Sequence, residues 1–72
     1  MIKQINSEIF ILGMGISGIS LAKYLMKKKI PVTCWDYNPE KRKVTHSLKI
    51  KINNMTPETL KNCNYLVLSP GI

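Results

Sequence analysis

The chain has 72 residues, of which 11 are lysine or arginine and 4 are aspartate or glutamate, so its formal net charge is +7. A chain of this length forms at most one small domain, and we expect residues 1–72 to be the front part of a longer protein. The basic residues are scattered with few aromatic residues among them, which argues against a nucleic-acid-binding surface. No segment is apolar over enough residues to span a membrane, and the cysteines lack metal-ligand or redox spacing, so we expect a cytoplasmic protein with reduced thiols.

A glycine-rich turn follows the first predicted strand, which spans residues 8–12 after a polar lead-in over residues 1–7. The glycines Gly13, Gly15 and Gly18 have the spacing Gly-x-Gly-x-x-Gly. Gly13 allows the turn, Gly15 lets the backbone approach a ligand closely, and Gly18 lets the next helix lie against the strand. These residues therefore predict a phosphate-binding loop, although a βαβ turn without any ligand can use the same glycines.

The helix predicted after this turn runs from Ser17 to about Lys29 and ends before Pro31. One face of it carries apolar residues at intervals of three and four positions, namely Ile19, Ala22, Leu25 and Met26. The hydroxyl of Ser17 is placed either to cap the helix or to contact a phosphate. We therefore expect this helix to pack on the sheet and to point its first turn at the ligand.

A second strand is predicted over residues 32–36 and ends in Asp36, about twenty residues after the glycines, as expected of an acid that binds a ribose. The alternative for Asp36 is a turn-forming carboxylate that accepts nearby backbone amides. Because ligands bind at the carboxyl ends of parallel strands, Tyr37 and Asn38 face the same crevice.

The rest of the chain predicts two more strands and one short helix. Residues 40–47 are polar and predict no element, and His46 among them is expected at the surface. Residues 48–52 alternate between apolar and basic, which is typical of a strand near a sheet edge. Thr56 and the proline after it begin a short helix, and residues 65–68 form the last strand. The predicted fold class is α/β, a Rossmann-like three-layer domain with a mostly parallel sheet of about four strands and two helices.

The glycine loop, Asp36 at the end of the second strand and the sequence Ser69-Pro70-Gly71-Ile72 together resemble the N-terminal domain of the Mur ligase family. The resemblance is strongest to the branch that adds D-glutamate to UDP-N-acetylmuramoyl-L-alanine in peptidoglycan synthesis. It implies that residues 1–72 hold the uridine diphosphate of that substrate as the first of three domains. ATP and Mg²⁺ would then act in the remainder of a monomeric ligase, and this chain would contain no catalytic residue, metal ligand or cofactor site.

The resemblance also implies roles for individual residues. Ile16 and Ser17 would meet the pyrophosphate beside Gly15, and Asp36 would accept a hydrogen bond from the uracil. The base would be lined by Tyr37, Asn38 and Gly71. Family members often have threonine and arginine where this chain has Tyr37 and Asn38, so Tyr37 is also a candidate for stacking on the base.

Two other functions fit part of the same pattern. In an NAD(P)-binding module of an oxidoreductase or transport regulator, Asp36 would bind the adenosine ribose, and Lys41 or Arg42 would accept a 2′-phosphate. That hypothesis leaves Ser69-Pro70-Gly71-Ile72 unexplained. A structural or interaction module without a ligand is the second alternative.

Overall fold

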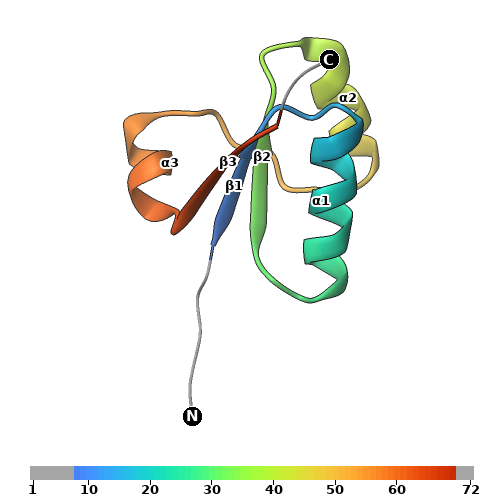
Figure 1. Ribbon diagram of the computed structural model, residues 1–72. Helices are drawn as coiled ribbons and strands as arrows, with labels where there is room; N and C mark the ends of the chain where they lie inside the picture. Colours follow the sequence, from blue (N-terminus) through green and yellow to red (C-terminus); the bar gives the residue numbers. More distant parts are fainter. Residues whose placement is uncertain (1–7, 70–72) are drawn as a thin grey trace.

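The computed structural model describes residues 8–69, which form a parallel sheet with helices on both of its faces (Figure 1). The elements in chain order are β1 (Ile9–Leu12), α1 (Ile16–Lys27), β2 (Val32–Trp35), α2 (Pro39–Ser47), α3 (Pro57–Asn62) and β3 (Tyr65–Leu68). The strand order is β2-β1-β3, and both neighbouring pairs are parallel. The predicted α/β class and the parallel sheet are therefore confirmed.

The centre of the sheet is β1, as its continuous apolar sequence predicts for a strand covered on both faces. Ile9 lies opposite Val32 on one side and Tyr65 on the other, and this register continues to the ends of the strands. Figure 1 shows α1 and α2 on one side of the sheet and α3 on the other. The core lies between α1 and the sheet and is formed by Ile11, Met14, Ala22, Leu25, Val32, Cys34 and Ile50.

The helix α1 is shorter than predicted at its carboxyl end and differs in its packing face. It ends at Lys27, because Lys29 adopts a left-handed conformation with φ of 62°. Ala22 and Leu25 are buried as predicted, whereas Met26 is 40% exposed, so its predicted place on the packing face was wrong. An apolar face of three residues on this short helix already covers β1 and β2, and Met26 lies beyond its edge.

Both α1 and α2 end in the same backbone motif. The N–H of Lys29 donates to the carbonyl of Met26 at 3.0 Å, and that of Ile30 donates to Leu25 at 2.9 Å. In α2 the corresponding bonds run from Lys49 to His46 at 2.9 Å and from Ile50 to Thr45 at 3.3 Å. These are the paired bonds of a Schellman motif, with a lysine at φ of 62° or 63° in the position that glycine usually occupies.

The expectation that residues 40–47 form no regular element was wrong, because they belong to α2. The Asn38 side chain caps this helix by accepting the N–H of Glu40 at 2.9 Å, and Pro39 occupies the first helical position. Asparagine, proline and an acid in this order are a helix-start signal, which the polar composition of the helix obscured.

The strand predicted over residues 48–52 is reduced to one bridge between Cys34 and Ile52, so the described residues contain three strands and not four. The Cys34 N–H donates to the carbonyl of Lys51 at 2.9 Å, and the Asn53 N–H donates to the carbonyl of Cys34 at 3.0 Å. Ile50 is 3% exposed, so the predicted alternation of buried and exposed side chains is present. The left-handed turn at Lys49 leaves too few residues to extend the pairing along β2.

The predicted short helix and last strand are both confirmed. Thr56 caps α3, since its hydroxyl oxygen accepts the N–H of Thr59 at 3.1 Å. Among the residues that the structure describes, β3 pairs with β1 alone, and Tyr65, Leu66 and Leu68 are 61%, 45% and 66% exposed. Within residues 8–69 no helix is long and apolar enough to cross a membrane.

Candidate functional site

The glycine loop joins β1 to α1 at the carboxyl edge of the sheet and is held by its neighbours on both sides. The Gly13 N–H donates to the carbonyl of Trp35, and the Ser69 N–H donates to the carbonyl of Leu12, each at 2.8 Å. Gly13 has φ of 104°, and a Cβ atom there would collide with the carbonyl oxygen of Ser69. A Cβ atom at Gly18 would collide with the carbonyl oxygen of Gly13. The predicted roles of these two glycines in the turn and in helix packing therefore match the backbone geometry.

The first turn of α1 has no capping side chain. Its N-cap is Gly15 in an extended conformation, so Ser17 is not the cap that one of its two predicted roles required. Ile16 is 85% exposed and Ser17 is exposed as well. An uncapped helix start presents backbone amides and partial positive charge to an anion. The Ser17 hydroxyl is thus exposed in an uncapped first turn, and its contact with a phosphate stays a prediction.

Asp36 connects the glycine loop to the turn after β2. Its Oδ2 accepts the N–H of Met14 at 2.7 Å, and its Oδ1 accepts the N–H of Asn38 at 2.8 Å. The bond to Asn38 is the turn-forming role that we considered as the alternative. The bond to Met14 places the carboxylate beside the loop, as the twenty-residue offset predicts. A carboxylate has about four lone-pair positions, so these two bonds leave acceptor capacity for a ligand.

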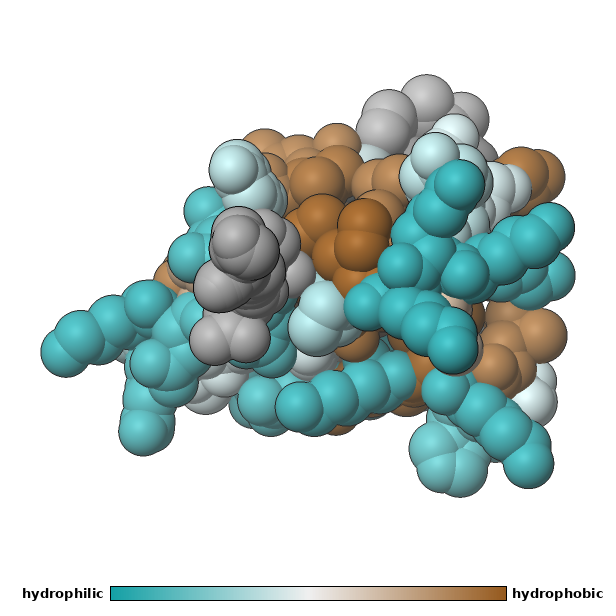
Figure 2. All heavy atoms as spheres, turned by 90° about the horizontal axis from the view of Figure 1, so that it is seen from below, coloured by the Kyte–Doolittle hydropathy of each residue, from teal (hydrophilic) through white to brown (hydrophobic). Residues whose placement is uncertain are grey.

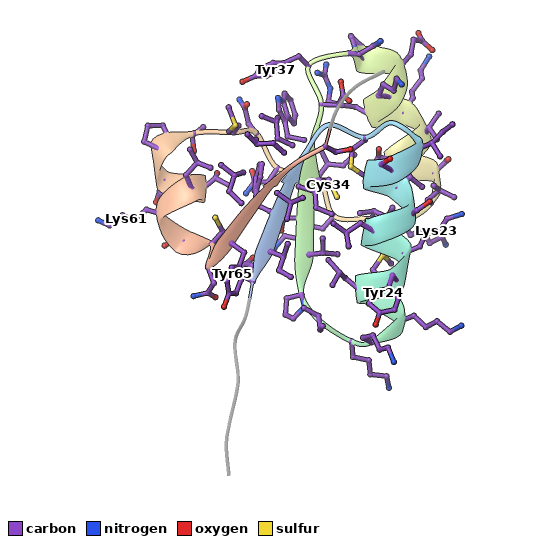
Figure 3. The ribbon with its side chains drawn as sticks, in the orientation of Figure 1. Lys23, Tyr24, Cys34, Tyr37, Lys61 and Tyr65 are labelled. Atoms are coloured by element: carbon purple, nitrogen blue, oxygen red, sulfur yellow. The ribbon has the colours of Figure 1, made fainter. Side chains whose placement is uncertain are left out.

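The other predicted site residues differ in their exposure and in whether their polar groups already have hydrogen-bond partners. Tyr37 is 67% exposed and points away from the body of the domain beyond the end of β2 (Figure 3). The Asn38 side-chain oxygen caps α2, its backbone N–H donates to Asp36, and its carbonyl accepts the N–H of Arg42. Only its side-chain NH₂ group is therefore left to donate to a base. Gly71 lies outside the described residues. The Oγ of Ser69, next to Gly18, is buried and has no hydrogen-bond partner among residues 8–69.

Trp35 was not predicted as part of this edge, and Arg42 was named only in the NAD(P) alternative, as a residue that would accept a 2′-phosphate. The Arg42 guanidinium lies 4.5 Å from the centroid of the Trp35 ring, and its Nη1 donates to the carbonyl of Asp36 at 2.8 Å. Trp35 also meets Tyr37 edge to face, with ring centroids 6.4 Å apart. Recognising α2 from its start signal would have placed Arg42 one helical turn after Asn38, on the face that meets the end of β2.

Two hollows lie near this edge or behind it. One of about 330 Å³ lies between α1 and α2, lined by Met14, Gly15, Ile16, Ile19, Glu40, Lys41 and Val44. The other, of about 400 Å³, lies toward α3 on the opposite face and is lined largely by polar residues, among them Thr33, Lys51 and Glu58. Only the first touches the glycine loop.

The described residues offer no metal centre, since no three His, Cys, Asp or Glu side chains in residues 8–69 gather around one point. Cys34 and Cys63 are free thiols. Burial raises the pKa of the Cys34 thiol from 9.0 to about 12, because the apolar surroundings disfavour the thiolate. Such a thiol is protonated near neutral pH and is a poor nucleophile or metal ligand.

Comparison with known proteins agrees with this geometry. The chain is 28% identical to a UDP-N-acetylmuramoylalanine–D-glutamate ligase from Saccharophagus degradans, in an alignment that covers 93% of this chain and 17% of the relative. The chain therefore spans about one sixth of the length of that relative. The family model described as the Mur ligase MurD-like N-terminal domain matches residues 7–72. Because that match takes in nearly every residue, including the glycine loop and Asp36, the chain belongs to the MurD-like N-terminal domain family of Mur ligases.

Proposed function

We propose that this chain binds the uridine diphosphate of UDP-N-acetylmuramoyl-L-alanine, as the N-terminal domain of an ATP-dependent ligase that adds D-glutamate in peptidoglycan synthesis. The family and the name of the relative support this class of substrate. The observation that carries the proposal is the hydrogen bond from the Met14 N–H to the Asp36 carboxylate at 2.7 Å. That bond connects the Asp36 carboxylate, which can accept a hydrogen bond from a base, to the glycine loop, whose amides can bind a phosphate.

In this proposal the diphosphate lies on the first turn of α1, where it accepts hydrogen bonds from the amides near Gly15 and Ile16 and from the Ser17 hydroxyl. The uracil lies over the end of β2. Its N3–H donates to Asp36, and the ring of Tyr37 stacks on it. Asn38 and Gly71 also line the base.

The domain supplies binding and not chemistry. Phosphoryl transfer from ATP needs a P-loop lysine and bound Mg²⁺, and the sequence of residues 1–72 has no Gly-x-x-x-x-Gly-Lys-Ser/Thr motif. We expect ATP and Mg²⁺ to bind in other domains of a monomeric, cytoplasmic enzyme. The chain alone should bind UDP weakly, because a helix terminus supplies about 0.3–2 kcal/mol whereas a micromolar Kd needs about 8 kcal/mol.

The lysines do not favour a nucleic-acid partner over this ligand. In the described part of the chain they come from α1 and its carboxyl end, from α2, from the segment after α2 and from α3, so they form no single stripe. Figure 2 views the end of the molecule where the strands begin and shows hydrophilic side chains around a hydrophobic centre. A spread of positive charge raises the local concentration of any small anion near the glycine loop.

The test is an amide NMR titration of the chain with UDP and, separately, with NAD. We expect saturable shifts at Ile16, Ser17, Asp36 and Gly71 with UDP, and smaller shifts with NAD. Stronger shifts with NAD would instead favour the dinucleotide module. Ser17→Ala should weaken UDP binding, while Ser20→Ala, an exposed serine of the same helix, should not. Equal affinity of the two variants would remove Ser17 from the proposed site.

A further inference from the structure

Arg42 makes two directed contacts with the end of β2 that the proposed ligand contacts do not include. It is the only arginine of the chain. Its backbone N–H donates to the carbonyl of Asn38 at 3.1 Å within α2. Its side chain reaches back to donate to the carbonyl of Asp36 at 2.8 Å and lies 4.5 Å from the Trp35 ring centroid. One side chain therefore holds two consecutive residues at the carboxyl edge of the sheet.

The Trp35 ring is positioned by contacts with its π-system and not by its own N–H group. The Trp35 indole nitrogen is buried and has no hydrogen-bond partner in the described part of the chain. The guanidinium of Arg42 covers the ring, and Tyr37 meets it at an interplanar angle of 88°. Tyr37 is 67% exposed, and its ring contacts that of Trp35. Removing the guanidinium would take away one of the two contacts that orient the Trp35 ring, on which the ring of Tyr37 packs.

Asp36 is held at its backbone and at its carboxylate by different partners. Arg42 binds its carbonyl, while the amides of Met14 and Asn38 bind its two carboxylate oxygens. Together these contacts fix both the position of the residue and the direction of its free lone pairs. A hydrogen-bond acceptor discriminates between ligands only when it is held in one geometry.

We infer that Arg42 is a positioning residue. It fixes the positions from which Asp36 and Tyr37 contact a pyrimidine base, and so determines the selection of uracil over cytosine. This inference rests on the proposed function, since it concerns the base end of the same site. Uracil has an N3–H that donates to a carboxylate, whereas N3 of cytosine is an acceptor and meets the carboxylate unfavourably. The ratio of the Kd values for CDP and UDP therefore reports the geometry of Asp36.

The geometry requires arginine specifically. A planar guanidinium stacks on an indole ring while one of its N–H groups donates in its own plane. A lysine at this position keeps the charge but cannot make both contacts at once, because its ammonium is compact and strongly hydrated. Lys43 lies next to Arg42 on α2 and is exposed, so Lys43→Met removes the same charge without these contacts.

The experiment measures the Kd values of UDP and CDP by NMR titration for the wild-type chain and for Arg42→Met, Arg42→Lys and Lys43→Met. We expect the wild-type chain to bind UDP with a Kd about tenfold lower than that of CDP. This ratio corresponds to about 1.4 kcal/mol, which is close to the contribution of one hydrogen bond to a charged group. Both Arg42 variants should lose most of this preference, and Lys43→Met should retain it. Arg42→Lys keeps the charge and the aliphatic stem, so it decides the result if Arg42→Met does not fold.

Each outcome tests either UDP binding by the chain or the role of Arg42. If the wild-type chain shows no saturable UDP binding, the proposed function itself fails. If the wild-type chain binds UDP but shows no preference over CDP, or if Arg42→Lys keeps the preference, the role of Arg42 is refuted while UDP binding stands. A fall in affinity for both nucleotides with an unchanged ratio would likewise show that Arg42 only supports the fold.

Discussion

Replacing Gly18 with alanine tests the close contact between α1 and the glycine loop. Helix propensity alone predicts that Gly→Ala inside a helix stabilises the fold by about 1 kcal/mol. The structure predicts the opposite sign, because the new Cβ atom would overlap the carbonyl oxygen of Gly13 and lie 3.3 Å from Ser69 Oγ. Overpacking costs about 1–3 kcal/mol, and a backbone carbonyl cannot rotate away as a side chain can, so we take the upper end.

The net expectation for Gly18→Ala is a loss of about 2 kcal/mol, which corresponds to a fall in Tm of about 8–16 °C for a domain of this size. Urea and thermal unfolding followed by circular dichroism measure it. Ser20→Ala is the matched control, because it places alanine at an exposed position of the same helix and should change the stability by only a few tenths of a kcal/mol. If Gly18→Ala is as stable as the wild-type chain, the contact with Gly13 does not constrain the helix.

Four further predictions concern other parts of the fold. Thr56→Ala removes the cap of α3 and should cost about 1 kcal/mol in urea unfolding. Lys29→Gly relieves a left-handed lysine and should stabilise the chain by about 0.5–1 kcal/mol, measured in the same way. Iodoacetamide should modify Cys63 before Cys34 in the folded chain, and the stability should decrease as the pH rises from 9.0 toward 12, because the native state keeps the Cys34 proton that the unfolded chain loses.

Each of these four expectations would be contradicted by a different result. An unchanged urea midpoint for Thr56→Ala would mean that α3 contributes nothing to the cooperative fold. Destabilisation by Lys29→Gly would show that the charge of Lys29 at the helix end outweighs the backbone strain. Equal alkylation rates of Cys34 and Cys63 would mean that the core around Cys34 opens frequently, and a Cys34→Ala variant with the same alkaline loss of stability would assign that loss to other groups.

The parts of the fold that were predictable from sequence are those with a local signal. Glycine spacing, Pro31 and the apolar run before Gly13 defined β1, the loop and the approximate bounds of α1. Thr56 with Pro57 defined α3 for the same reason. The segment after Asn38 was misjudged because a surface helix with only Thr45 buried carries almost no hydrophobic periodicity. Its start signal, Asn38 followed by Pro39 and Glu40, was present but was not recognised.

The strand expected over residues 48–52 failed for a tertiary reason. Alternation was visible because Ile50 enters the core, but the length of a strand depends on where the chain leaves the preceding helix. At the site, the offset between the glycines and Asp36 correctly implied that they would meet, and the contact with Met14 shows it. The contacts of Arg42 with Trp35 and with the carbonyl of Asp36 were missed because they depend on α2, which had not been predicted.

The repeated Schellman motif determines where the chain returns to the sheet after α1 and after α2. At the end of both α1 and α2 an isoleucine follows the left-handed lysine and turns inward, Ile30 partly buried and Ile50 at 3% exposure. Each isoleucine thereby fixes the point at which the chain returns to the sheet, and so the residue at which β2 and the bridge at Ile52 can begin to pair. A one-residue insertion within either turn would therefore move the side chains of the next pairing segment to the opposite face of the sheet. The chain after the bridge is held as well, since the Asn53 N–H donates to the carbonyl of Cys34 and the Asn54 carbonyl accepts the hydroxyl of Thr59.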